Sequence, residues 1–115
     1  NFWASWCPPC VEELPSLMQM QTDLQNKGVV VVGVSVDADA GDYEKFLKDH
    51  NVNFVTVRDP GQQNKTGVIA EVSSKYGTYR FPETYIIDRN GMVRRKLIGA
   101  VNFTQPEIME YLSRL

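Results

Sequence analysis

The 115-residue sequence predicts a single α/β domain, residues 1–115, in which helices flank a central mixed sheet. Two patterns lead to this prediction. Strand-like segments alternate with segments of helical periodicity along most of the chain, as expected for parallel strands joined by crossover helices. Toward the C-terminus, two strand-like segments are separated only by a short turn that ends in Asn90-Gly91, which favours an antiparallel hairpin.

The first half of the chain alternates between strands and helices. Residues 2–4 have the character of a strand end, and a helix is predicted from Pro8 to about Asn26, with Gly28 at the usual stop position. Its apolar residues recur at roughly helical spacing and are Val11, Leu14, Leu17, Met18, Met20 and Leu24. The β-branched run of residues 29–36 predicts a central strand buried on both faces, and residues 42–50 predict a second helix.

The middle of the chain is the least regular part. Residues 54–57 predict a short strand, Pro60 to Gly67 a polar loop, and residues 68–75 a short helix. The loop is either a tolerated surface insertion, which is the commoner case, or a determinant of partner choice.

The C-terminal third carries the clearest local pattern. The hairpin pairs residues 84–87 with residues 92–98, and the basic side chains of its second strand suit an exposed sheet edge. Residues 104–115 predict a closing helix, with Thr104 as its N-cap and Glu107 completing a capping box.

Composition argues against several classes of function. A formal net charge of −2 and an isoelectric point near 5.3 give no electrostatic reason to expect a nucleic-acid partner. The longest apolar run, residues 29–36, is far shorter than the ~20 residues of a membrane helix. We therefore expect no nucleic acid as partner and no membrane span in this chain.

Cys7 directly precedes the first predicted helix and Cys10 lies in its first turn, with two prolines between them. Three positions apart, the two cysteines share one helical face, a spacing that permits a disulfide. Lowering a thiol pKa from about 8.5 to about 7 takes roughly 2 kcal/mol, which a helix N-terminus can supply to Cys7. The alternative, half of a zinc site, is weak, because zinc takes about four ligands and His50 is the one histidine of the sequence.

Further motifs accompany the cysteine pair. They are FWASWCPPC at residues 2–10, Pro15, FPET at residues 81–84 before an apolar strand, and Gly99-Ala100. Together they resemble the thioredoxin fold along the whole chain. WCPPC followed by Glu13, and PETYIID followed by the Asn-Gly turn, are most similar to the extracytoplasmic TlpA/ResA-type thiol-disulfide oxidoreductases, which include proteins of cytochrome c maturation.

The resemblance implies exchange of disulfides with protein thiols. Cys7 would be the exposed nucleophile and Cys10 the buried resolving thiol, so that the Cys7–Cys10 disulfide is the only redox group and no further cofactor or metal is needed. Pro15 would kink the first helix without ending it. We expect a monomer whose partners are protein substrates and a membrane or periplasmic redox donor.

The same resemblance assigns a substrate groove. Pro82 would follow a cis peptide bond beside the cysteines, and Phe81 would offer its backbone to an extended substrate segment. Trp6 and Gly99, with Ala100, would form the other walls.

Asn1 departs from the pattern of ordinary thioredoxins, which carry a buried aspartate at the matching position. Asparagine cannot handle the proton of the resolving cysteine. Glu13 lies one turn beyond Cys10 and matches a glutamate of the TlpA/ResA type, so the resemblance makes it the proton shuttle. A solvated first-turn acid is the simpler alternative for Glu13.

The prolines bear on the direction of the reaction. Pro8 and Pro9 remove two N–H groups that would stabilise a Cys7 thiolate, so we expect a reductant or a mid-potential couple. Two rival functions stay open: a peroxiredoxin-like thiol peroxidase, and a binding module that keeps the fold without turnover.

Location follows only from the resemblance, which implies life outside the cytoplasm, in a bacterial periplasm or tethered on the outer face of the membrane. The chain begins within a strand pattern at Asn1. We therefore expect its natural N-terminal strand or strands, with a signal or anchor, to lie upstream of this sequence.

Overall fold

A five-stranded mixed sheet forms the centre of the molecule, as seen in a computed structural model that describes residues 1–59, 62–64, 67–69 and 71–115. The strand order is β3-β2-β1-β6-β7. The strands are β1 (Phe2–Trp3), β2 (Val32–Ser35), β3 (Val55–Arg58), β6 (Glu83–Ile87) and β7 (Val93–Ile98). β1, β2 and β3 are parallel, whereas β6 is antiparallel to both β1 and β7. The predicted mixed sheet and its C-terminal hairpin are therefore confirmed.

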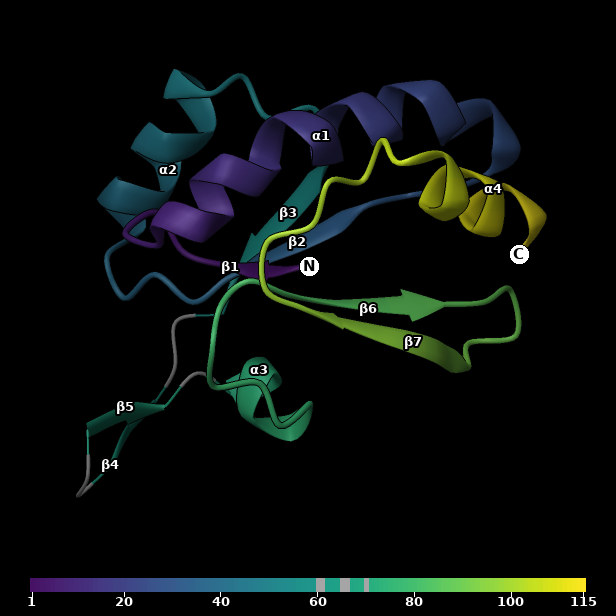
Figure 1. The fold of residues 1–115 in the computed structure, drawn as a ribbon. Helices are drawn as coiled ribbons and strands as arrows, with labels where there is room; N and C mark the ends of the chain where they lie inside the picture. Colours follow the sequence, from purple (N-terminus) through teal and green to yellow (C-terminus); the bar gives the residue numbers. More distant parts are fainter. Residues whose placement is uncertain (60–61, 65–66, 70) are drawn as a thin grey trace.

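The helices lie on both sides of this sheet. They are α1 (Pro8–Leu24), continued by the 3-10 turn η1 (Gln25–Lys27), α2 (Ala40–Asp49), α3 (Glu71–Lys75) and α4 (Pro106–Arg114). α1, α2 and α4 cover one face, and α3 lies against the other (Figure 1). α1 and α2 share a face because both are right-handed crossovers between parallel strands that step in the same direction across the sheet.

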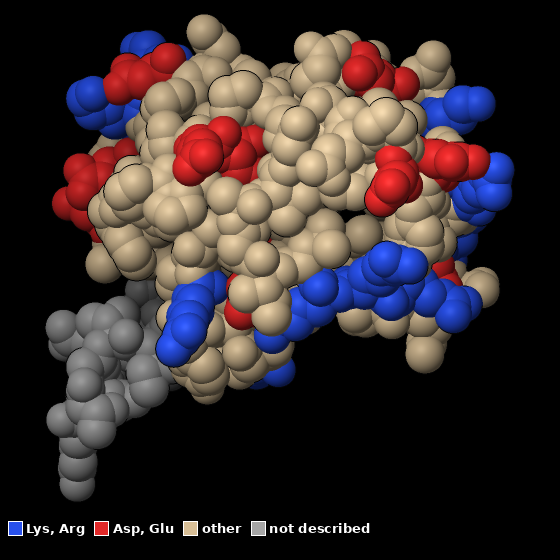
Figure 2. All heavy atoms as spheres, viewed as in Figure 1, with Lys and Arg blue, Asp and Glu red and all other residues tan. Residues whose placement is uncertain are grey.

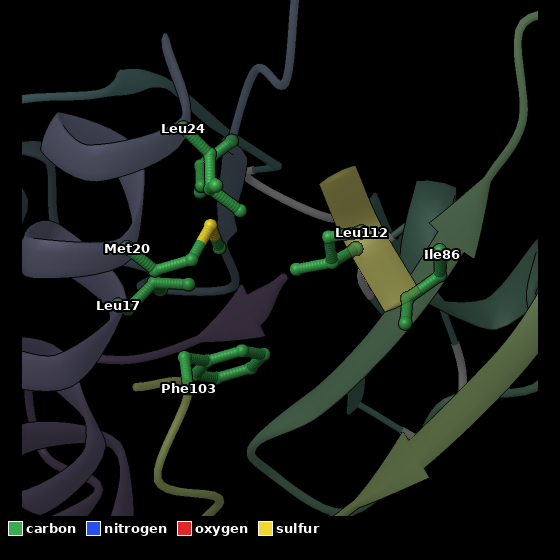
Figure 3. Close-up of a cluster of buried hydrophobic side chains, with 7 residues drawn as sticks. Leu17, Met20, Leu24, Ile86, Phe103 and Leu112 are labelled. Carbon is green, nitrogen blue, oxygen red and sulfur yellow. The ribbon is translucent and has the colours of Figure 1, made fainter. Parts of the chain in front are cut away.

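α1 is the longest helix and connects the cysteine pair to the core. Cys7 is its N-cap, and the helix continues through Pro15 to Leu24. It ends at Gly28, whose φ of 79° lies in the left-handed region that glycine adopts most easily. The apolar side of α1 packs against β6, α4 and the segment before α4 (Figure 3). The residues of this core cluster are Leu17, Met20, Leu24, Val31, Ile86, Phe103 and Leu112.

β2 differs from its prediction. The strand covers only Val32–Ser35, and Val30 and Val32 are exposed, so the run is not buried on both faces. Pairing with β1 and β3 covers the edges of β2, whereas burial of a face needs an element packed over it, and the side chains of Val30 and Val32 are left uncovered. An open apolar cavity of about 520 Å³, lined in part by Val30 and Val32, borders this region.

The stretch predicted as a loop and a helix also differs. Gln62–Asn64 (β4) and Gly67–Ile69 (β5) pair as a small antiparallel sheet, so the described part of the predicted loop is a hairpin. The remaining positions 60, 61, 65 and 66 lie outside the described residues. α3 begins only at Glu71, because the Asp59 carboxylate accepts the N–H groups of residues 71–73 and fixes the helix start there.

The edge strand β7 and the last helix, α4, complete the domain. Lys and Arg side chains line the molecule along β7, the edge strand of the described sheet (Figure 2). α4 is present, but its N-cap is Gln105, because the Thr104 hydroxyl bonds to Asn102 instead. In the part of the chain that the structure describes, no helix combines the length and apolar character needed to cross a membrane.

Candidate active site

The two cysteines form a disulfide at the start of α1. Cys7 follows β1 and caps the helix, while Cys10 lies in the first turn, with 5.3 Å between their Cα atoms. The Cys10 N–H donates to Cys7 Sγ at 3.3 Å. The carbonyl oxygen of Phe81 lies 3.5 Å from the same sulfur. The Cys7 sulfur therefore sits between a helix N-terminus and the segment before β6.

The expected difference in exposure between the cysteines is wrong for this oxidised state. Cys7 is 4% exposed and Cys10 is 6% exposed. Both belong to an apolar cluster with Trp3, Leu14 and Phe46, against which Phe81 also packs. Both cysteines are buried because distant residues pack against them, and the CPPC motif itself does not predict this burial.

Of the residues assigned to the substrate groove, Phe81 lies against Cys7, while Trp6 and Gly99 contact Phe81 and Pro82. Trp6 is 63% exposed, and its ring meets that of Phe81 edge-to-face with 6.1 Å between centroids. The Phe81–Pro82 peptide bond is cis. The Gly99 N–H donates to the Pro82 carbonyl at 2.9 Å, which brings the end of β7 beside this segment. The tertiary structure thus brings together residues that are up to 93 positions apart, counting from Trp6 to Gly99.

Pro82 follows a cis peptide bond beside the cysteines, as predicted, but it does not expose its side chain. Its side chain is fully buried, so it has no surface with which to contact a substrate. It belongs to the cis-peptide segment in which the Phe81 carbonyl lies against Cys7.

Glu13 is a buried carboxyl group, not a solvated first-turn acid. It is 3% exposed, and its Oε1 accepts a hydrogen bond from Asn1 Nδ2 at 2.8 Å. Its Oε2 accepts the Val101 N–H at 2.8 Å. Burial raises the pKa of Glu13 above 4.5, although the hydrogen bonds from Val101 and Asn1 act in the opposite direction. Among the described contacts, none joins Glu13 to either sulfur of the disulfide.

Two residues near the site, Thr84 and Asp37, were not among the site residues predicted from the sequence. Thr84 accepts the second hydrogen bond of Asn1 Nδ2 at 2.9 Å and so helps to orient the amide that contacts Glu13. Asp37 is buried and bonds to Ser5, two residues before Cys7. One signal was present for Asp37: an acid directly follows a parallel strand, at the sheet edge where Cys7 lies.

The described residues contain no group of three or more His, Cys, Asp or Glu side chains that could hold a metal ion. His50, at the end of α2, is exposed and its ring packs 4.2 Å from that of Phe46. The described part of the chain therefore offers Cys7 and Cys10 no additional zinc ligands.

A mixed sheet with a CXXC disulfide at the first turn of a helix, facing a cis-proline segment, defines a protein of the thioredoxin-like class. The comparison with known proteins agrees. This chain belongs to the AhpC/TSA family, which it matches over residues 1–96.

Individual relatives show which proteins of this class the chain is similar to. A crystal structure assigned as a thiol:disulfide interchange protein DsbE from Chlorobium tepidum shares 36% identity and a TM-score of 0.75, covering 98% of this chain and 72% of that one. StoA from Bacillus subtilis superposes with a TM-score of 0.73 at 25% identity, covering 98% and 76%. The thiol-disulfide oxidoreductase ResA of Geobacillus thermodenitrificans is 30% identical over all of this chain and 60% of its own length. The predicted similarity to ResA-type proteins is therefore confirmed. The chain spans about three-fifths of the length of such curated relatives.

Proposed function

We propose that this chain is a thiol-disulfide oxidoreductase that exchanges disulfides with protein thiols through Cys7 and Cys10. The observation that carries the proposal is the position of the Cys7 sulfur, which caps α1, accepts the Cys10 N–H and is bonded to Cys10. A helix N-terminus stabilises a thiolate, and the thiolate is the attacking species in disulfide exchange.

In the reductive direction, the Cys7 thiolate attacks one sulfur of a substrate disulfide. The substrate S–S bond breaks, its other sulfur leaves as a thiolate that takes up a proton, and Cys7 is left in a mixed disulfide with the substrate. The Cys10 thiolate then attacks Cys7 Sγ and displaces the second substrate thiolate. The Cys7–Cys10 disulfide forms, and two electrons have passed to the substrate without another cofactor.

Glu13 takes the proton from Cys10 before the second attack. A buried carboxyl whose pKa is raised by burial is a better base than an ordinary glutamate, because its basicity is closer to that of a thiol. It lies one helical turn beyond Cys10. The oxidised state has no Cys10 proton to transfer, so the proposal requires Glu13 to reach Cys10 in the reduced protein.

The substrate binds across Trp6, Phe81 and Gly99. Trp6 supplies an exposed aromatic face, and the backbone at Phe81 receives an extended substrate segment by strand addition. Pro82 contributes through the shape of the backbone. The exposed aromatic ring of Trp6 beside Phe81 fits an extended protein segment better than a small polar molecule.

The proposed direction is reduction, or exchange at an intermediate potential. Pro8 and Pro9 provide no N–H to the Cys7 sulfur, and of the described backbone groups only Cys10 donates to it. The names of the ResA and DsbE relatives support a protein-thiol substrate, and by the same resemblance we place the protein outside the cytoplasm, as a monomer supplied by a membrane or periplasmic redox donor. Cytochrome c maturation is one setting that needs such a reductant.

A trapping experiment tests the function. In Cys10→Ser the mixed disulfide cannot resolve, so the reduced variant should retain a protein substrate on Cys7 that mass spectrometry identifies. The double variant Cys7→Ser/Cys10→Ser is the matched control and should retain nothing. Wild-type protein should also catalyse reduction of insulin disulfides by dithiothreitol, and Cys7→Ser should not. A reactive Cys7 that traps no substrate would refute the exchange mechanism.

The same proteins separate the rival functions. Consumption of hydrogen peroxide that depends on Cys7 and exceeds disulfide reduction would favour a thiol peroxidase. Absence of both activities with the fold intact would favour a binding module.

A further inference from the structure

Asp37 is 1% exposed although it is an acid, and the exchange mechanism above does not use it. We propose that Asp37 is a positioning residue for Cys7, whose carboxylate fixes the Ser5–Trp6 loop between β1 and the cysteine. This inference rests on the proposed disulfide exchange and adds to it a residue that acts through Ser5.

The contacts of the Asp37 carboxylate are concentrated on the loop. The Ser5 N–H donates to its two oxygens at 3.2 and 3.1 Å, and the Ser5 hydroxyl donates to Oδ1 at 2.6 Å. The Ser35 hydroxyl donates to Oδ2 at 2.5 Å. One carboxylate thus holds both the backbone and the side chain of Ser5.

The sheet register explains why these residues meet. β1 and β2 are parallel, and Trp3 pairs with Ser35. Two positions further along each strand lie Ser5 and Asp37, at the edge of the sheet where parallel strands end. Cys7 follows on the same edge, so the loop that carries it passes directly beside Asp37.

Asp37 is itself held firmly. Its N–H donates to the Ser35 hydroxyl at 3.0 Å, and Arg58 Nη1 donates to its carbonyl at 3.3 Å. None of the ion pairs among the described residues involves its carboxylate. A buried carboxylate without an ionic partner is costly unless hydrogen bonds satisfy it, and here the loop and the neighbouring strand provide them.

Loop position matters for the reaction because disulfide exchange needs the attacking sulfur in line with the bond that breaks. The loop makes one further backbone hydrogen bond, from the Cys7 N–H to Ala4 at 3.2 Å. Without Asp37, Ser5 would lose its side-chain partner, and this turn would be the remaining backbone hydrogen bond between β1 and Cys7, while Cys7 itself stays in the disulfide and the first turn of α1. A misplacement of about 1 Å is enough to slow a reaction severely.

Four variants test the proposal: Asp37→Ala, Asp37→Asn, Ser5→Ala, and the double variant Ser5→Ala/Asp37→Ala. Asp88→Asn is the matched control, because the Asp88 carboxylate also accepts two backbone N–H bonds but lies at the far end of β6. Two quantities are measured under conditions where each protein is folded: the rate constant for reduction of insulin disulfides, and the hydrogen-exchange rates of the Ser5, Trp6 and Cys7 amides.

We expect Asp37→Ala to slow disulfide reduction about tenfold and to speed amide exchange at residues 5–7 by a similar factor, as loss of these hydrogen bonds allows. Asp37→Asn, whose amide oxygen still accepts from Ser5, should lie within about threefold of wild type in both. Because Asp37 acts through Ser5, the double variant should be no slower than Asp37→Ala. Asp88→Asn should leave both quantities unchanged.

Wild-type rates in folded Asp37→Ala, or effects of Ser5 and Asp37 that multiply as independent changes, would overturn the proposal. Should Asp37→Ala not fold, Asp37→Asn and Ser5→Ala decide it through the amide exchange of residues 5–7. That readout needs no activity, so a wild-type protein without disulfide reduction would refute the proposed function and leave the positioning role to be judged by amide exchange alone.

Discussion

Asn1 Nδ2 donates a hydrogen bond to Glu13 Oε1 at 2.8 Å, joining the first strand to the first helix beneath the cysteine pair. An aspartate at position 1 has no proton to donate when it is ionised, whereas the asparagine amide donates to Glu13 and to Thr84. The asparagine at this position therefore donates a hydrogen bond to a buried glutamate, which an ionised aspartate could not do. This pair leads to three predictions.

Glu13→Gln should slow the second step of exchange, in which Cys10 displaces the substrate from Cys7. General-base catalysis contributes about 10²-fold or more, and glutamine cannot take the Cys10 proton. Single-turnover reduction of a protein disulfide, followed as decay of the mixed disulfide, measures this step. Glu12→Gln is the control, because Glu12 is the exposed neighbour on α1. Equal rates in the two variants would remove Glu13 from the mechanism.

Glu13 should make the protein less stable as the pH rises. Burial raises its pKa in the folded state above the unfolded value of 4.5, so the folded protein binds the proton more tightly. The stability that Glu13 contributes is therefore fully present below the unfolded pKa and is lost as the pH rises through the folded pKa.

The measurement is the free energy of unfolding in urea of wild type and Glu13→Gln, from about pH 4 to about pH 8. The difference, wild type minus variant, should fall with increasing pH, by at most about 1.4 kcal/mol per pH unit. A difference that is constant or increases with pH would show that the folded pKa of Glu13 is not raised.

Asn1→Asp should move the pH dependence of the second exchange step upward. The new carboxylate faces Glu13 at hydrogen-bond distance, and two like charges cannot both ionise easily, so the pKa of the pair rises by about one unit or more. Asn1→Ala removes the hydrogen bond without adding a charge and should shift the profile less. The midpoint of the rate against pH decides between them, and an unchanged midpoint in Asn1→Asp would contradict the prediction.

Pro9→Ala should make the disulfide more oxidising. The only described backbone N–H that reaches Cys7 Sγ is that of Cys10, and alanine at position 9 adds a donor close to the sulfur. A stabilised thiolate raises the midpoint potential, by about 30 mV for a tenfold change in equilibrium constant. Equilibration with glutathione buffers measures it. Pro15→Ala adds an N–H further along α1 and should leave the potential unchanged, so an equal shift in both variants would exclude a local effect.

Phe103→Ala should destabilise the domain strongly. Phe103 is almost completely buried among α1, β6 and α4, where truncation leaves a cavity (Figure 3). The expected loss is about 3–5 kcal/mol in the free energy of unfolding. Met92→Ala, at an exposed side chain, should change it by less than about 0.5 kcal/mol. Urea unfolding monitored by circular dichroism provides both values.

Much of the fold could be predicted because its signals are local. The periodicity of α1, the Gly28 stop and the Asn-Gly hairpin turn each depend on neighbours in sequence. The errors arose where distant contacts decide. Residues 68–69 pair with β4, and the start of α3 is set by hydrogen bonds from its backbone to Asp59, which precedes it by 12 positions.

In the candidate site, too, some features could be predicted from neighbouring residues and others depend on distant contacts. The spacing of Cys7 and Cys10 at the start of a predicted helix was sufficient to predict that a disulfide could form at a helix N-terminus, because residues three positions apart share one helical face. Burial of Cys7, by contrast, depends on Phe81, which lies 74 positions away. Sequence spacing carries no information on that packing.

By itself, the sequence determined the helix that begins at the cysteines, the mixed character of the sheet and the chemistry of two thiols on one helical face. Only the tertiary structure decided which distant groups surround them: Asn1 and Val101 on Glu13, and Asp37 on Ser5. The physical reason is the distance along the chain over which each interaction acts. Periodicity and capping act over a few residues, whereas the surroundings of a buried carboxyl depend on which strands lie side by side and in what register.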